Sequence, residues 1–65
     1  DVDVAVYDLA GRRIRTLVAG RLAEGTHELV WAGSDDAGRA VASGVYLVRA
    51  IGAGQDVVRR VALVR

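Results

Sequence analysis

Short runs of alternating apolar and polar residues, separated by glycines, constrain the fold of this chain most. The run DVDVAVYD, residues 1–8, places Val2, Val4 and Val6 on one side of an extended strand. Four further runs of strand-forming residues follow, at 12–19, 26–31, 45–51 and 56–64. Because glycines lie between these runs, the pattern predicts an all-β sandwich or barrel of short strands.

The segment GRRIRTLVAGRLAEG, residues 11–25, also fits a helix. Its apolar residues recur at helical spacing from Ile14 to Leu22, and Arg, Leu, Ala and Glu all favour helix. However, Gly20 interrupts the segment, and no capping residue precedes it. We therefore predict a strand over 12–19.

Two similar segments, YDLAGRRI and SDDAGRAV, raise the question of a duplicated site. An Asp at the first position of a type I turn accepts a hydrogen bond from the backbone two residues on, and a Gly at the fourth position takes a positive φ. We assign these turn positions to Asp8 and Gly11 and to Asp36 and Gly38, with Asp35 in solvent. The repeat is then turn chemistry between antiparallel strands.

The size and charge of the chain limit its function. Its 65 residues make one small domain, residues 1–65, and without cysteine it has no disulfide. Nine basic residues against eight acidic residues leave a net charge of +1, so we expect no nucleic-acid binding. No apolar run approaches the roughly 20 residues of a membrane helix, so we expect no membrane insertion.

Few residues are suited to catalysis. His27 is the only histidine, and neither Ser34 nor Ser43 lies in a nucleophile motif. The nearest approach to a calcium site is the pair Asp35 and Asp36, but the regular spacing of a calcium loop is absent. We therefore expect that the chain is not an enzyme and that it binds no cofactor and no metal ion.

The predicted core consists of apolar residues on the alternating runs: Val4, Val6, Ile14, Leu29, Trp31, Tyr46, Val48, Val61 and Leu63. The runs at 1–8, 45–51 and 56–64 carry apolar residues on both faces, although a two-layer sandwich needs only one. Two explanations stay open. Exposed strand positions tolerate valine, or another chain covers a second face or an open edge.

Several motifs appear in a characteristic order. They are a VYD-x-x-G-R-x-V/I-x-x-L hairpin, a G-x-H-x-x-x-W-x-G strand end, a D-x-x-G-R turn and an S-G-V-Y strand. The matching residues are Val6, Tyr7, Asp8, Gly11, Arg12, Ile14, Leu17, Gly25, His27, Trp31, Gly33, Asp36, Gly38, Arg39, Ser43, Gly44, Val45 and Tyr46. The chain thereby resembles the immunoglobulin-like domain of flagellar hook-capping proteins, the FlgD type. That domain is similar to the C-terminal sorting modules of type IX secretion systems.

The resemblance implies an immunoglobulin-like β-sandwich of about six short antiparallel strands, here without one N-terminal strand. It also implies a non-catalytic structural or assembly module of a bacterial secreted or cell-surface protein, with a C-terminal sorting or anchoring role. The alternative is a subunit of an extracellular filament or other homopolymer. Its partners would be its own upstream segment or neighbouring subunits, through strand addition or sandwich docking. A homo-oligomer is compatible with this mode of assembly.

Overall fold

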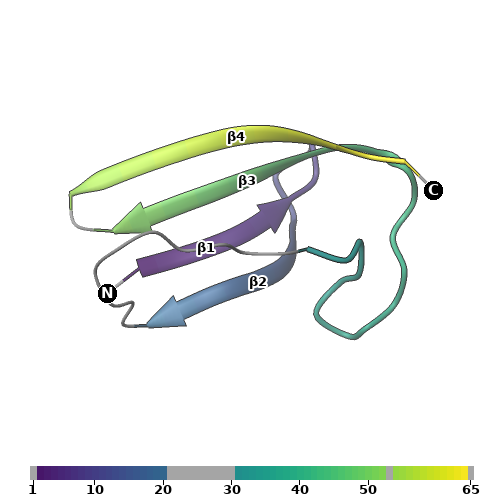
Figure 1. The fold of residues 1–65 in the computed structure, drawn as a ribbon, viewed down its shortest axis with the longest axis horizontal. Helices are drawn as coiled ribbons and strands as arrows, with labels where there is room; N and C mark the ends of the chain where they lie inside the picture. Colours follow the sequence, from purple (N-terminus) through teal and green to yellow (C-terminus); the bar gives the residue numbers. More distant parts are fainter. Residues whose placement is uncertain (1, 21–30, 53, 65) are drawn as a thin grey trace.

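The described strands form one antiparallel sheet. The computed structural model describes residues 2–20, 31–52 and 54–64. Its four strands are β1 (Val2–Tyr7), β2 (Arg13–Gly20), β3 (Gly44–Gly52) and β4 (Gln55–Leu63), in the spatial order β2-β1-β3-β4 (Figure 1). The all-β class is therefore confirmed, and the segment at 12–19 is a strand rather than a helix.

The strand count differs from the sequence prediction. The described residues hold four strands rather than about six. Most of the predicted strand at 26–31 lies outside the described residues, and its last residue, Trp31, belongs to no strand. The described residues also contain no helix long and apolar enough to span a membrane.

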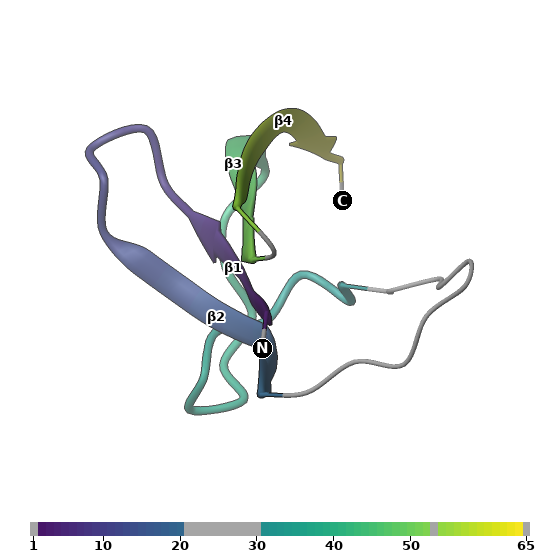
Figure 2. The ribbon, with the colours of Figure 1, turned by 90° about the vertical axis from the view of Figure 1, so that its left-hand side faces the viewer.

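The central strand β1 divides the side chains between two faces of the sheet. Val2, Val4 and Val6 define the valine face, and Asp3, Ala5 and Tyr7 define the polar face, because neighbouring residues of a strand alternate. β1 pairs with β2 on one side and with β3 on the other. Figure 2 shows that the β1–β2 pair is inclined to β3 and β4, as expected for a twisted sheet.

The pairing of β2 with β1 is interrupted twice. Val18 pairs with Val4, but Thr16 pairs with Ala5, so Leu17 is an extra residue between them. Ile14 is a second extra residue, where the register shifts again. Such β-bulges change which face a side chain occupies, and simple alternation along β2 therefore fails.

Among the described residues, the core is small and centred on β1. Val4, Ala5, Val6 and Tyr46 are buried, and Val6 is completely inaccessible to solvent. The other described members of the predicted core are only partly buried: Ile14, Trp31, Val48, Val61 and Leu63. Leu29 lies outside the described residues. Ala5 was not predicted as a core residue, because it lies on the polar face of β1.

Trp31 and Tyr46 attach the segment before β3 to the sheet. Their rings meet edge to face, with centroids 5.0 Å apart and an interplanar angle of 70°. The Trp31 indole donates a hydrogen bond to the Ser34 carbonyl at 2.8 Å, and the Tyr46 hydroxyl donates one to the Ala42 carbonyl at 2.6 Å. Both aromatic residues therefore satisfy their polar atoms while their rings pack together.

Candidate functional site

The first Asp turn is held by its own backbone and by an ion pair. Asp8 Oδ1 accepts hydrogen bonds from the amides of Ala10, at 3.0 Å, and Arg12, at 2.9 Å. The Gly11 amide donates to the Asp8 carbonyl, and Gly11 has a φ of +89°. Arg12 Nε lies 3.0 Å from Asp8 Oδ2. This turn joins β1 to β2.

The second turn repeats these contacts with Asp35, and Asp36 does not start it. Asp35 Oδ1 accepts hydrogen bonds from the amides of Ala37, at 3.0 Å, and Arg39, at 2.9 Å. The Gly38 amide donates to the Asp35 carbonyl, and Gly38 has a φ of +82°. The assignment of Asp36 to the first position of the turn is therefore wrong, and Asp36 occupies the second position. The two segments align on Gly and Arg, and the Asp three residues before Gly38 is Asp35.

Both turn carboxylates are held in the ionised state. The pKa of Asp8 lies below the ordinary 3.8, mainly because its carboxylate accepts a hydrogen bond from the Arg12 amide. The pKa of Asp35 is lowered in the same way by the Arg39 amide. A general acid needs a raised pKa to keep its proton near neutral pH. These two carboxylates therefore suit a structural role.

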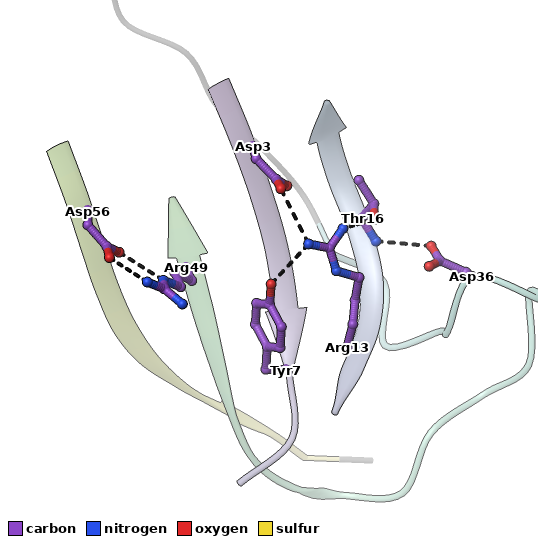
Figure 3. A network of polar contacts seen from close by, with 7 residues as sticks. All are labelled: Asp3, Tyr7, Arg13, Thr16, Asp36, Arg49 and Asp56. Atoms are coloured by element: carbon purple, nitrogen blue, oxygen red, sulfur yellow. Dashed lines mark hydrogen bonds and ion pairs between the residues drawn. The ribbon is translucent and has the colours of Figure 1, made fainter. Parts of the chain in front are cut away.

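Unlike Asp35, whose carboxylate closes the second turn, Asp36 binds the edge strand β2. Its amide donates to the Ile14 carbonyl at 3.0 Å, and its Oδ1 accepts from the Thr16 amide at 3.0 Å (Figure 3). Arg15 adds a hydrogen bond from its guanidinium to the Asp35 carbonyl at 2.7 Å. The second turn thus occupies backbone groups of β2 beside its bulge, where another strand would otherwise pair.

On the polar face, Arg13 connects β2 to β1. Its guanidinium donates to the Tyr7 hydroxyl at 3.0 Å, to Asp3 Oδ2 at 3.3 Å and to Thr16 Oγ1 at 3.1 Å (Figure 3). The guanidinium also lies 5.6 Å from the centre of the Tyr7 ring. The hydrogen bonds to Tyr7 and Asp3 raise the pKa of Arg13, so its charge is fixed.

A second pair on the same face connects β3 to β4. Arg49 makes two hydrogen bonds to the Asp56 carboxylate, one of them from Nε at 2.9 Å (Figure 3). These bonds lower the pKa of Asp56. The sequence does carry a signal for this pair, since the two opposite charges flank the glycines of a hairpin turn. Such pairs across adjacent strands stabilise a sheet.

The candidate catalytic and metal-binding residues of the described chain lie apart or have other partners. Asp35 and Asp36 direct their carboxylates to different partners, the turn and β2. Among the described residues, no group of three or more His or acidic residues lies together to hold a metal ion. Ser34 accepts a hydrogen bond from Arg15 at 3.4 Å. His27 lies outside the described residues.

Apolar side chains remain at the surface instead. An open pocket is lined by Leu17, Trp31, Val48, Val61, Ala62 and Leu63. On β4, Val57 is 36% and Val58 is 48% exposed. Every residue of β4 from Gln55 to Arg60 is exposed, so this strand contributes little to the core. A strand of this kind is a candidate for contact with another chain.

Comparison with known families identifies the type of domain. A model of the FlgD Ig-like domain matches residues 1–56, which include β1, β2 and β3 and the start of β4. The chain belongs to this family. None of the curated proteins and none of the solved structures compared with the chain matches it. The predicted resemblance to FlgD-type domains is confirmed, and the similarity to type IX sorting modules stays a prediction. As a FlgD Ig-like domain, the chain is a structural immunoglobulin-like module.

Proposed function

We propose that this domain is a non-catalytic anchoring or sorting module of a bacterial secreted or cell-surface protein. Membership of the FlgD Ig-like family supports a role in an exported assembly. In this role the domain binds other protein segments through strand edges and apolar surface rather than through side-chain chemistry. The protein that carries it would be retained or assembled outside the cell through this module.

The observation that carries the proposal is that the described carboxylates accept hydrogen bonds from other groups of the domain. The described residues include five acidic side chains, and each accepts a hydrogen bond: Asp3, Asp8, Asp35, Asp36 and Asp56. These bonds lie within a turn, connect two strands or, for Asp36, connect a turn to β2. Acid–base and metal chemistry would need such carboxylates, but here they stabilise the fold. Apolar residues such as Val58, in contrast, are exposed to solvent.

A fusion experiment tests the sorting role. The chain is attached to the C-terminus of a monomeric fluorescent reporter with an export signal, in a bacterium that has a type IX secretion system. We expect the reporter at the cell surface. The matched control carries Val6→Asp, which places a charge at the fully buried core position and unfolds the module. Periplasmic retention of the folded fusion, with the same distribution as the control, would contradict the sorting role.

The second candidate is a subunit of an extracellular homopolymer that receives a strand from its neighbour. The position of β4 favours this candidate. Within the described residues β4 has a strand neighbour, β3, on one side, and its other side could receive a strand from another subunit. Sedimentation velocity over a range of concentrations separates the two candidates. Large species that grow with concentration support the polymer, whereas a compact monomer or a closed small oligomer supports the module.

A further inference from the structure

We propose that β4 pairs antiparallel with β4 of a second copy of this chain, about a two-fold axis at Val58. The two sheets would then form one continuous sheet. This inference rests on the proposed function and deepens it, because it names a second copy as one partner of the module. It rests on the exposed edge, the regular register and the charge pattern of β4.

The two edge strands of the sheet differ in their capacity to pair. β2 has two bulges, and Asp36 occupies its backbone groups at Ile14 and Thr16. β4 pairs with β3 without a register shift over its nine residues, from Gln55 opposite Gly52 to Leu63 opposite Gly44. A regular edge strand presents a row of main-chain donors and acceptors to a further strand, whereas a bulged and covered edge does not.

Symmetry limits how two copies of β4 can align. A two-fold axis perpendicular to the sheet brings the same face of both copies to one side. Residues that pair across the axis must therefore lie on the same face, so both have even numbers or both have odd numbers. The axis then passes midway between the two copies of a single residue, which lies opposite its own copy. The candidates near the middle of β4 are Val57, Val58, Arg59, Arg60 and Val61.

Charge and overlap select among these axes. An axis at Arg59 or Arg60 places two like charges opposite each other, which destabilises an antiparallel pair. An axis at Val57 or Val61 lies farther from the middle of β4 than Val58 does, so fewer residues of the strand overlap. The axis at Val58 avoids an opposed arginine pair and keeps the longer overlap.

The same axis creates two ion pairs. With Val58 opposite itself, Asp56 of each copy lies opposite Arg60 of the other. Both residues lie on the polar face, where Asp56 already binds Arg49. The Arg60 guanidinium makes no hydrogen bond or ion pair within the described residues, although the backbone of Arg60 pairs with β3, so the side chain is available for this contact. On the valine face, Arg59 of one copy lies opposite Val57 of the other. The pairing would cover Val57 and Val58, which are now exposed.

Single cysteines test the register directly, because the natural chain has none. Four variants are compared under mild oxidation: Val57→Cys, Val58→Cys, Arg59→Cys and Arg60→Cys. A disulfide requires its two β-carbons within about 4.5 Å, so the residue on the axis should cross-link at least about tenfold faster than its neighbours. We expect Val58→Cys to be fastest. Faster cross-linking at another position, or equal rates at all four, overturns the proposed register.

A charge variant with a matched control tests the ion pairs in the otherwise natural chain. Arg60→Glu places Glu opposite Asp56, and we expect it to weaken dimerisation about tenfold, because two pairs are lost. Arg59→Glu changes the net charge equally but faces Val57, and it should leave the dimer intact. Equal effects of the two variants contradict the inference.

Sedimentation velocity of the unmodified chain separates this inference from the proposed function. A concentration-dependent dimer supports pairing through β4. A monomer at every concentration overturns it, as does a dimer that Arg60→Glu does not weaken. Neither result affects the fusion experiment, in which surface retention of the reporter is measured independently of dimerisation.

Discussion

The turns at 8–12 and 35–39 share four of their five residues and the same internal hydrogen bonds, but they contact the sheet differently. The first turn connects β1 and β2, and its second residue, Leu9, is 66% exposed. The second turn has Asp36 at that position, and Asp36 binds the backbone of β2.

This difference separates the local role of the motif from its tertiary role. Asp at the first position and Gly at the fourth make the same closing contacts in both places. The second position faces away from the turn, so it is free to be apolar or to bind a neighbouring strand. One residue thus decides whether the same turn also covers a sheet edge.

The largest effects are expected from Gly11→Ala and Gly38→Ala. Each glycine has a positive φ, and no atom lies within 4 Å of the position that a β-carbon would occupy. The cost is therefore backbone strain alone, about 1–2 kcal/mol of the free energy of unfolding for either variant. Urea unfolding, followed by the fluorescence of the only tryptophan, Trp31, measures it. Clearly unequal losses would show that the two turns are not equivalent.

A smaller loss is expected for Asp36→Ala, at about 1 kcal/mol, because the Thr16 amide loses its acceptor. Hydrogen exchange at the Thr16 amide should become faster. The matched control is Leu9→Ala at the equivalent position, which should change stability by less than about 0.5 kcal/mol. If both substitutions had the same effect, the contact between Asp36 and β2 would contribute nothing measurable.

Acid should weaken both turns. The pKa values of Asp8 and Asp35 are lowered in the folded chain, so the unfolded chain binds protons more readily. Their contribution is therefore present above the ordinary carboxyl pKa of 3.8 and is lost as the pH falls through the lower folded values. Urea midpoints measured from about pH 6 to about pH 2 should decline less steeply in Asp8→Asn and Asp35→Asn than in the natural chain. Curves parallel to that of the natural chain would contradict this assignment.

The smallest effects are expected for Arg12→Gln and Arg39→Gln. Both arginines pair with their turn carboxylates, but their side chains are mostly exposed. Exposed ion pairs of this kind contribute little, because solvent screens them and the side chains lose freedom on pairing. We expect no measurable change in the urea midpoint of either variant. A marked loss in only one of them would reveal a further contact in that turn.

Much of the fold follows from local patterns in the sequence. Alternation predicts β1, and strand-forming residues between glycines predict β2, β3 and β4, because a strand with one buried face must repeat every second residue. The D-x-A-G-R pattern predicts both turns, although the wrong Asp was assigned in the second. The order of motifs indicates the FlgD-type domain, which the family match confirms.

The contacts between distant segments were not predictable in the same way. The bulges at Ile14 and Leu17 depend on how β2 pairs with β1, and alternation within one strand contains no information about such a shift. The burial of Ala5 depends on the side chains that surround it on adjacent strands. The contact of Asp36 with Thr16 joins residues 20 positions apart, so no local pattern specifies it.

By itself, the sequence determined the strands, the glycine turns and the class of domain, because backbone geometry and the two-residue repeat act over a few neighbouring positions. Among the described strands, the tertiary structure alone decided which edge of the sheet the second turn covers and which edge has no further strand beside it. That outcome depends on the folding of the second turn against β2 and on the position of β4 beyond β3, and both arise only when distant parts of the chain meet.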